Sequence, residues 1–166
     1  MKKINNFYIL MLSIVTLSGT TATAQISKAE IKATGLTCSM CSNAIYKQLK
    51  SMPDVADVET DLNTNTFTVK LKEGNTTSPK AFKDNVEKAG FFIGSLVLTT
   101  TAATIQQDQY VLINNNKSST NSEVQIQVLD KGYVTEKEFK KLSKSLKAIE
   151  TYASNNESDF HIKMIK

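Results

Sequence analysis

Two cysteines separated by two residues are the side chains of this sequence best suited to chemistry. Cys38 and Cys41 are the only cysteines among 166 residues, and they follow the stretch Gly35-Leu36-Thr37. Thiolates at this spacing can both bind one small soft metal ion, and a helix beginning at the pair would stabilise them through its N-terminal N–H groups and its dipole. The pair therefore predicts either metal capture or thiol redox chemistry.

The segments on either side of the cysteines have the patterns of a strand and a helix. Apolar and polar residues alternate over 29–34, as in a half-buried strand, and Gly35 allows a sharp turn after it. Apolar residues then recur at helical spacing from Cys41 to Met52, and Pro53 ends the element. The cysteines are therefore expected in a loop that opens directly into a helix.

The next segments predict a hairpin, a second helix and a fourth strand. Alternating residues over 56–72 indicate two strands joined by a turn at 63–65. Pro79 opens a second helix that ends at Gly90, where a left-handed residue suits a helix end, and 91–98 has the pattern of a strand. The order strand, helix, strand, strand, helix, strand is that of a ferredoxin-like βαββαβ sandwich.

The second half of the chain predicts a linker and a small α+β region. Residues 100–109 are rich in threonine and glutamine and are expected to form the linker. Two strands follow, then a helix that starts at a capping box of Thr135 and Glu138 and has apolar positions as far as Ile149, then a terminal strand. This ββαβ order leaves open whether the region forms its own sheet, extends the first one or completes a small barrel. The fold class is thus α+β in both halves.

The first 24 residues have the features of a secretory signal. Lys2 and Lys3 give a positive start, 7–17 form a short apolar stretch, and small residues occupy 22–24. We expect cleavage after Ala24 and a mature chain that is periplasmic or otherwise exported. No later stretch approaches the roughly 20 apolar residues that a membrane span needs, so no span is expected in the mature chain.

Composition argues against several classes of partner and reaction. The chain has a formal net charge of +4, or +2 without Lys2 and Lys3, and all of its 20 basic residues are lysines. Arginine supplies the planar fork that best recognises guanine or phosphate, so nucleic acid is not an expected partner. The sequence has no glycine-rich phosphate loop and no nucleophile elbow, and the protein is expected to be non-enzymatic.

Three segments of the first half carry a family resemblance. They are Gly35-Leu36-Thr37-Cys38-Ser39-Met40-Cys41 after the first strand, Pro53 and Val55 before the hairpin, and Val86-Glu87-Lys88-Ala89-Gly90-Phe91 at the end of the second helix. Through these segments, residues 26–99 resemble the heavy-metal-associated domain of copper chaperones, metal-pump tails and the periplasmic mercury-binding protein. The resemblance implies that Cys38 and Cys41 hold Cu(I), or another soft ion such as Hg(II), in a near-linear dithiolate site.

The same resemblance implies supporting roles for four residues around the cysteines. Gly35 and Thr37 belong to the loop that presents the thiols. Leu36 stands where the family usually has methionine, and its side chain is expected to pack beneath the loop, because leucine and methionine are similar in volume. Phe91 matches a position beside the metal loop and is expected to shield the site.

The expected organisation is a signal peptide at 1–24, a heavy-metal-associated domain at 25–99, a linker at 100–109 and a small α+β domain of unknown role at 110–166. Thiolates select Cu(I) over harder ions, and two sulfurs leave coordination positions open to an incoming thiolate. The expected function is that of a Cu(I) chaperone or scavenger, with a metal-transporting ATPase or a cuproprotein as its transient partner.

Three alternatives stay open. Hg(II), Zn(II) or another soft metal could be the cargo, because the same ligands would bind it. The metal domain could instead be a sensor whose output lies in residues 105–166. The third alternative is a thiol-disulfide redox role, although no tryptophan precedes Cys38 and the only prolines, Pro53 and Pro79, offer no cis-proline partner.

The remaining candidate residues are expected to have no ligand role. Met40 is expected to point to solvent, and His161 is expected to be exposed because it alternates with apolar residues on the last strand. Asp57, Glu59 and Asp61 are expected as solvated charges on the outer face of a strand. The C-terminal helix carries lysines for which a solvated face is expected and a basic docking face for an acidic partner is the alternative. These are Lys137, Lys140, Lys141, Lys144 and Lys147.

Overall fold

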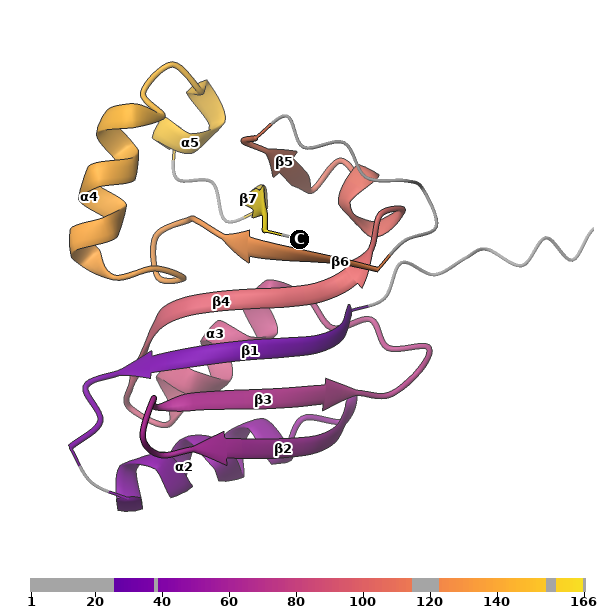
Figure 1. Cartoon of the computed structure of the whole chain (residues 1–166), viewed down its shortest axis with the longest axis vertical. Helices are drawn as coiled ribbons and strands as arrows, with labels where there is room; N and C mark the ends of the chain where they lie inside the picture. The colour runs from indigo at the N-terminus through magenta and orange to yellow at the C-terminus, as the bar shows by residue number, and fades with distance from the viewer. Residues whose placement is uncertain (1–25, 38, 115–122, 155–157, 166) are drawn as a thin grey trace, which may run out of the picture.

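The computed structural model describes residues 26–37, 39–114, 123–154 and 158–165 of the chain. Within these ranges seven strands form one sheet with the order β2-β3-β1-β4-β6-β7-β5, shown in Figure 1. The elements are, in chain order, β1 (Ile26–Thr34), α2 (Ser39–Lys50), β2 (Val55–Asp61), β3 (Thr66–Leu71), α3 (Pro79–Lys88), β4 (Phe92–Thr101), the 3-10 helix η1 (Thr104–Gln106), β5 (Tyr110–Leu112), β6 (Glu123–Val128), α4 (Glu136–Ser145), α5 (Glu150–Ser154) and β7 (Phe160–Met164).

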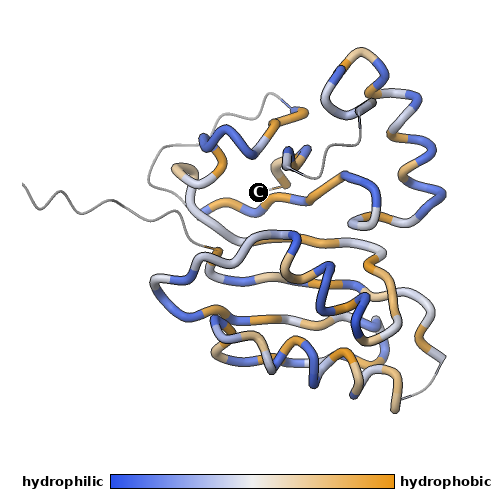
Figure 2. The backbone as a smooth tube through the Cα atoms, turned by 180° about the vertical axis from the view of Figure 1, so that it is seen from behind, coloured by the Kyte–Doolittle hydropathy of each residue, from blue (hydrophilic) through white to orange (hydrophobic). Residues whose placement is uncertain are grey.

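The first four strands and two helices confirm the predicted ferredoxin-like arrangement. Strand β1 lies between β3 and β4 and pairs antiparallel with both, and β2 pairs antiparallel with β3. Helices α2 and α3 cover one face of these strands (Figures 1 and 2). None of the described helices has the length and apolar character needed to cross a membrane.

The core lies between these helices and the sheet. Ile45 and Leu49 of α2, and Phe82 and Val86 of α3, are fully buried there. Each pair is separated by one helical turn, so each helix has one apolar side. Burying each of these side chains stabilises the fold by about 1.5–3 kcal/mol relative to exposure. The strands contribute Ala29, Ile31, Phe67, Val69, Leu96 and Leu98.

The C-terminal region extends the first sheet, which settles the three possibilities that the sequence left open. Strand β6 pairs antiparallel with β4, β7 pairs antiparallel with β6, and β5 pairs parallel with β7. Residues 100–109, expected to be a linker, contain the end of β4 and the 3-10 helix η1. The division into two domains at 100–109 stays a prediction. The hydrogen-bonded sheet continues from the first region into the second through the pairing of β4 with β6.

The helical part of the C-terminal region differs from its prediction. The sequence predicts one helix from Thr135 with apolar positions as far as Ile149, whereas α4 ends at Ser145 and a separate short helix, α5, begins at Glu150. One half of the predicted capping box is confirmed, because the Thr135 hydroxyl accepts a hydrogen bond from the Glu138 N–H. The chain turns between the two helices. As a result, the buried Tyr152 side chain of α5 packs against Leu129, and its hydroxyl donates a hydrogen bond to the Leu129 carbonyl.

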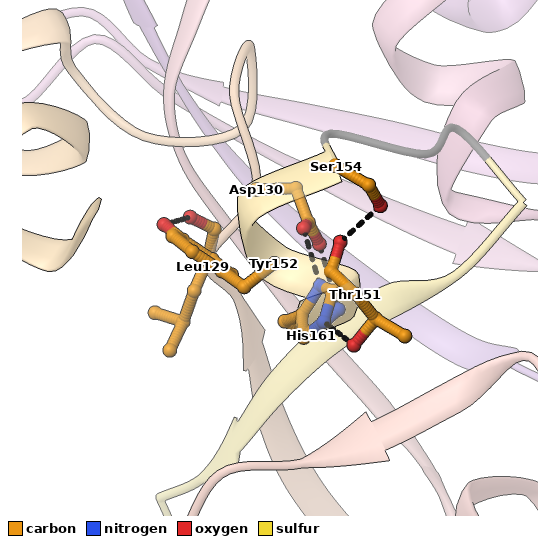
Figure 3. Close-up of polar contacts among 6 residues, drawn as sticks. All are labelled: Leu129, Asp130, Thr151, Tyr152, Ser154 and His161. Atoms are coloured by element: carbon orange, nitrogen blue, oxygen red, sulfur yellow. Dashed lines mark hydrogen bonds and ion pairs between the residues drawn. The ribbon is translucent and has the colours of Figure 1, made fainter. Parts of the chain in front are cut away.

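The prediction that His161 faces solvent is wrong. Its side chain is 1% exposed, because β7 is flanked by β6 and β5 and is covered by α5. Figure 3 shows its imidazole between two partners: Nδ1 lies 2.7 Å from Asp130 Oδ1, and Nε2 lies 2.8 Å from Thr151 Oγ1. The His161 backbone N–H also donates to Asp130 Oδ2. Burial raises the pKa of the Asp130 carboxyl, and its hydrogen bonds with His161 act in the opposite direction.

This network gives a prediction for stability. Asp130→Ala would leave the buried imidazole and backbone N–H of His161 without their acceptor, and we expect the free energy of unfolding to fall by about 2–3 kcal/mol. Urea unfolding at constant pH measures this change. Asp108→Ala removes an exposed carboxylate and is the control, with an expected change below about 0.5 kcal/mol. Equal effects of the two substitutions would contradict a stabilising role for the network.

Candidate metal-binding site

The loop between β1 and α2 is built on a left-handed glycine. Gly35 has a φ of +84°, which residues with a side chain rarely adopt, so the chain turns sharply where β1 ends. Leu36 is partly buried and packs against the main core, as the sequence predicted, while Thr37 is exposed. Cys38 lies outside the described residues, so the structure does not test its predicted position.

Cys41 lies in the first turn of α2 and is half-buried. The first turn of a helix has N–H groups without intrahelical acceptors and a positive dipole end, and both favour a thiolate over a thiol. The first turn of α2 holds no acidic residue, so no carboxylate within that turn opposes this effect. Cys41 is therefore placed where a sulfur anion is stabilised by the backbone.

Phe91 reaches the same loop from the end of α3. Gly90 has a φ of +86° and its N–H donates to the Glu87 carbonyl, while the Phe91 N–H donates to the Val86 carbonyl. This pair of hydrogen bonds is a Schellman motif, which ends α3 and turns the chain toward β4. A Cβ atom placed on Gly35 would lie 4.0 Å from Cδ1 of the Phe91 ring. The ring thus packs beside the turn that leads to the cysteines.

The turn between β2 and β3 forms the other neighbour of the loop. The Asn65 carbonyl accepts a hydrogen bond from the Ala33 N–H, which holds this turn against the end of β1. Leu62 and Asn65 line a hollow together with Leu36, Thr37, Ser39 and Ser42. The sequence predicted a turn at 63–65 but gave no sign that it borders the loop, because this contact depends on how the strands pair.

The end of the sheet near the loop exposes several apolar side chains. Met40 is 80% exposed, which agrees with its predicted direction toward solvent, and Leu62 is 56% exposed. Phe92, the neighbour of Phe91, is 66% exposed. The structure therefore brings Gly35, Leu36, Thr37, Cys41 and Phe91 to one end of the sheet. Among the described residues, no three His, Cys, Asp or Glu side chains gather in a metal-binding group.

Comparisons with known proteins point to one family for the first half of the chain. Residues 30–92 match the family model described as "Heavy-metal-associated domain". This range begins within β1, contains both cysteines and ends at the first residue of β4. No curated protein matches the chain.

Solved structures similar to the chain include two domains whose names mention copper and one metallochaperone. The yeast copper transporter domain Ccc2a is 28% identical over 40% of this chain and 90% of its own, with a TM-score of 0.37. A second structure is the N-terminal domain of a potential copper-translocating P-type ATPase from Bacillus subtilis in the Cu(I)-loaded state. It is 31% identical over 40% of this chain and 82% of its own, with a TM-score of 0.36. The CopZ metallochaperone is 19% identical over 40% of this chain and 98% of its own, with a TM-score of 0.37.

The matched range coincides with most of the βαββαβ arrangement. The matched range spans the strand, glycine turn, cysteine loop, two helices and hairpin of the βαββαβ arrangement, and it stops before the C-terminal region. Through residues 30–92, this chain belongs to the heavy-metal-associated domain family.

Proposed function

We propose that this protein binds a soft metal ion, preferentially Cu(I), between the thiolates of Cys38 and Cys41 and passes it to a partner protein. The observation that carries the proposal is the position of Cys41, in the first turn of α2 directly after the glycine turn of a heavy-metal-associated domain. Thiolates are soft ligands, and Cu(I) is a soft ion that accepts low coordination numbers.

Transfer follows from the chemistry of two sulfur ligands. Each thiol must lose its proton to bind the ion, and the helix N-terminus lowers the cost of that loss for Cys41. A thiolate of the partner can then bond to the ion before the bonds to Cys38 and Cys41 break. The ion keeps its oxidation state throughout, because only its ligands are exchanged. Thr37, Ser39 and Met40 are exposed on the loop, which leaves room for a partner to approach.

The residues around the cysteine loop shield one side of the proposed metal site and leave another side open to a partner. Leu36 anchors the loop in the core, and the Phe91 ring packs beside Gly35. An apolar ring at this position keeps water and small oxidants from one side of the sulfurs. We also propose that the chain works after export, with residues 1–24, which lie outside the described residues, as the signal that directs it.

Hg(II) scavenging is the alternative use of the same ligands, and Zn(II) is a third candidate ion. Both ions bind thiolates, so geometry around Cys41 does not separate them from Cu(I). Metal analysis of the full chain purified without air distinguishes the three cargoes. We expect copper as the main metal; mercury or zinc in its place would assign the site to that ion.

The cysteines give the direct test of the proposed site. We expect Cys38→Ala and Cys41→Ala each to weaken Cu(I) binding at least about a hundredfold, because one thiolate cannot complete a two-sulfur site and loss of even an outer-shell partner costs 10- to 100-fold. Anaerobic titration against a competing Cu(I) chelator measures this affinity, and circular dichroism checks the fold. Ser39→Ala, which changes an exposed residue between the cysteines, is the matched control. Unchanged affinity in either cysteine variant would refute the assignment.

The shielding role of Phe91 can be tested beside its exposed neighbour. Phe91→Ala removes a ring that packs beside Gly35, so we expect the thiols to react about tenfold faster with a disulfide reagent, since thiol exchange depends on access. Phe92→Ala removes an equally large ring that is mostly in water and should leave the rate unchanged. A rate that rises equally in both variants, or in neither, would show that Phe91 does not shield the site.

A further inference from the structure

An exposed row of lysines follows one side of α4. Because an α-helix advances about 100° per residue, four of its lysines fall within an arc of about 100°. All are exposed, as is the lysine that follows the helix, and no ion pair joins any of them to another described residue. The lysine row consists of Lys137, Lys140, Lys141, Lys144 and Lys147.

The opposite side of α4 is held by the fold. Phe139, Leu142 and Leu146 pack against a small buried cluster that contains Leu129, Val134 and Tyr152. The Phe139 and Tyr152 rings lie 5.9 Å apart between centroids. The apolar side of the helix is thereby used inside the protein, and the lysine row is directed outward at a fixed position. Figure 2 shows the hydrophilic and hydrophobic residues that alternate along α4.

The lysine row begins close to the loop that carries the cysteines. Val134, just before α4, forms a β-bridge with Ser95 of β4. A Cβ atom placed on Gly94 would lie 2.5 Å from the Thr34 methyl and 3.5 Å from the Thr135 methyl. The end of β1 and the N-cap of α4 therefore flank the same point of β4. Figures 1 and 2 both show α4 and the β1–α2 loop on the same side of the molecule.

An exposed aromatic ring lies between the loop and the lysine row. Phe92 pairs with Thr34 across β1 and β4. It also lines a hollow with Lys83 and Glu87 of α3 and with Tyr133 and Glu136 at the start of α4. The same hollow is also lined by Lys131 and by the carboxylates Asp130 and Asp159, so the charges around Phe92 are of both signs. Exposed aromatic rings beside charged side chains are common in protein interfaces.

We propose that the lysine row and Phe92 form a docking surface for an acidic protein that exchanges the metal ion with Cys38 and Cys41. The proposal rests on the proposed function, to which it adds the chemical character of the partner. Exposed lysines attract carboxylates and raise the rate of encounter, and here the helix that carries them starts near the end of β1, the strand that leads into the cysteine loop. A lipid surface is the weaker candidate, because the apolar residues of α4 are partly buried against the small cluster and lie on the side of the helix opposite the lysine row.

The test compares two variants of equal net charge. Lys140→Gln, Lys141→Gln and Lys144→Gln together remove the centre of the lysine row. Lys47→Gln, Lys72→Gln and Lys163→Gln together remove three exposed lysines on α2, after β3 and on β7, and form the control. Circular dichroism and Cu(I) affinity against a chelator are measured first for all three proteins. The probes are an acceptor peptide with a Cys-X-X-Cys motif flanked by glutamates and the same peptide with glutamines.

The expected result is a slower transfer to the glutamate peptide only when the lysine row is changed. At low ionic strength we expect Cu(I) transfer, followed by stopped flow, to slow about tenfold in the row variant and to be unchanged in the control variant. The difference should vanish at about 0.5 M salt, where exposed charges are screened, and it should be absent with the glutamine peptide.

Three outcomes would overturn the docking surface. One is equal slowing in both variants, because net charge alone would then explain the rate, and another is no slowing in either. The third is lysine-dependent binding to vesicles of phosphatidylglycerol and phosphatidylcholine with unchanged transfer to the peptide, which would assign the row to a lipid surface. Metal-free binding of the glutamate peptide is measured in parallel by fluorescence anisotropy. If that binding needs the lysine row while the unmodified protein takes up no Cu(I), the docking surface is supported and the proposed function alone fails.

Discussion

Hydrogen bonding of β4 on both of its sides is the interaction on which the rest of the structure depends. β4 pairs with β1 over almost its whole length and with β6 from Leu96 to Thr101. In a ferredoxin-like domain alone β4 would be an edge strand with unpaired backbone groups. Here the pairing joins the cores, so that Val124 and Ile126 of β6 are buried in the same cluster as the helices α2 and α3. It also determines where α4 lies relative to the cysteine loop.

Local patterns in the sequence were sufficient to predict β1 to β4, α2 and α3. Each of these elements buries one side, so its hydrophobic period is visible without knowledge of its neighbours. Gly35 and Gly90 mark turns whose left-handed backbone needs glycine, and both turns were predicted. The same two turns position Leu36 and Phe91, whose supporting roles follow from the family resemblance and stay predictions. The assignment of Cys38 itself stays a prediction.

The errors arose where pairing between distant segments decides burial. Thr99 and Thr100 lie where the predicted fourth strand meets the predicted linker, and both are buried in the part of β4 that pairs with β6. His161 alternates with apolar neighbours as a surface residue would, but β7 lies between β6 and β5, and Thr151 and Tyr152 of α5 pack against the imidazole. The break between α4 and α5 has no glycine or proline to mark it. These features depend on long-range contacts, which periodicity does not record.

The proposed metal transfer imposes two opposing requirements, and we propose that the two halves of this chain address them separately. A two-sulfur site has to release its ion readily, so it can have few further ligands, and the encounter with a partner must then supply specificity. Exposed charges give such an encounter speed and direction without tight binding, since each exposed pair contributes little energy. The sheet places the start of α4, which lies outside the residues that match the family, near the end of β1, the strand that leads into the cysteine loop. In the proposed docking surface, the C-terminal region selects the partner and leaves the chemistry of the sulfurs unchanged.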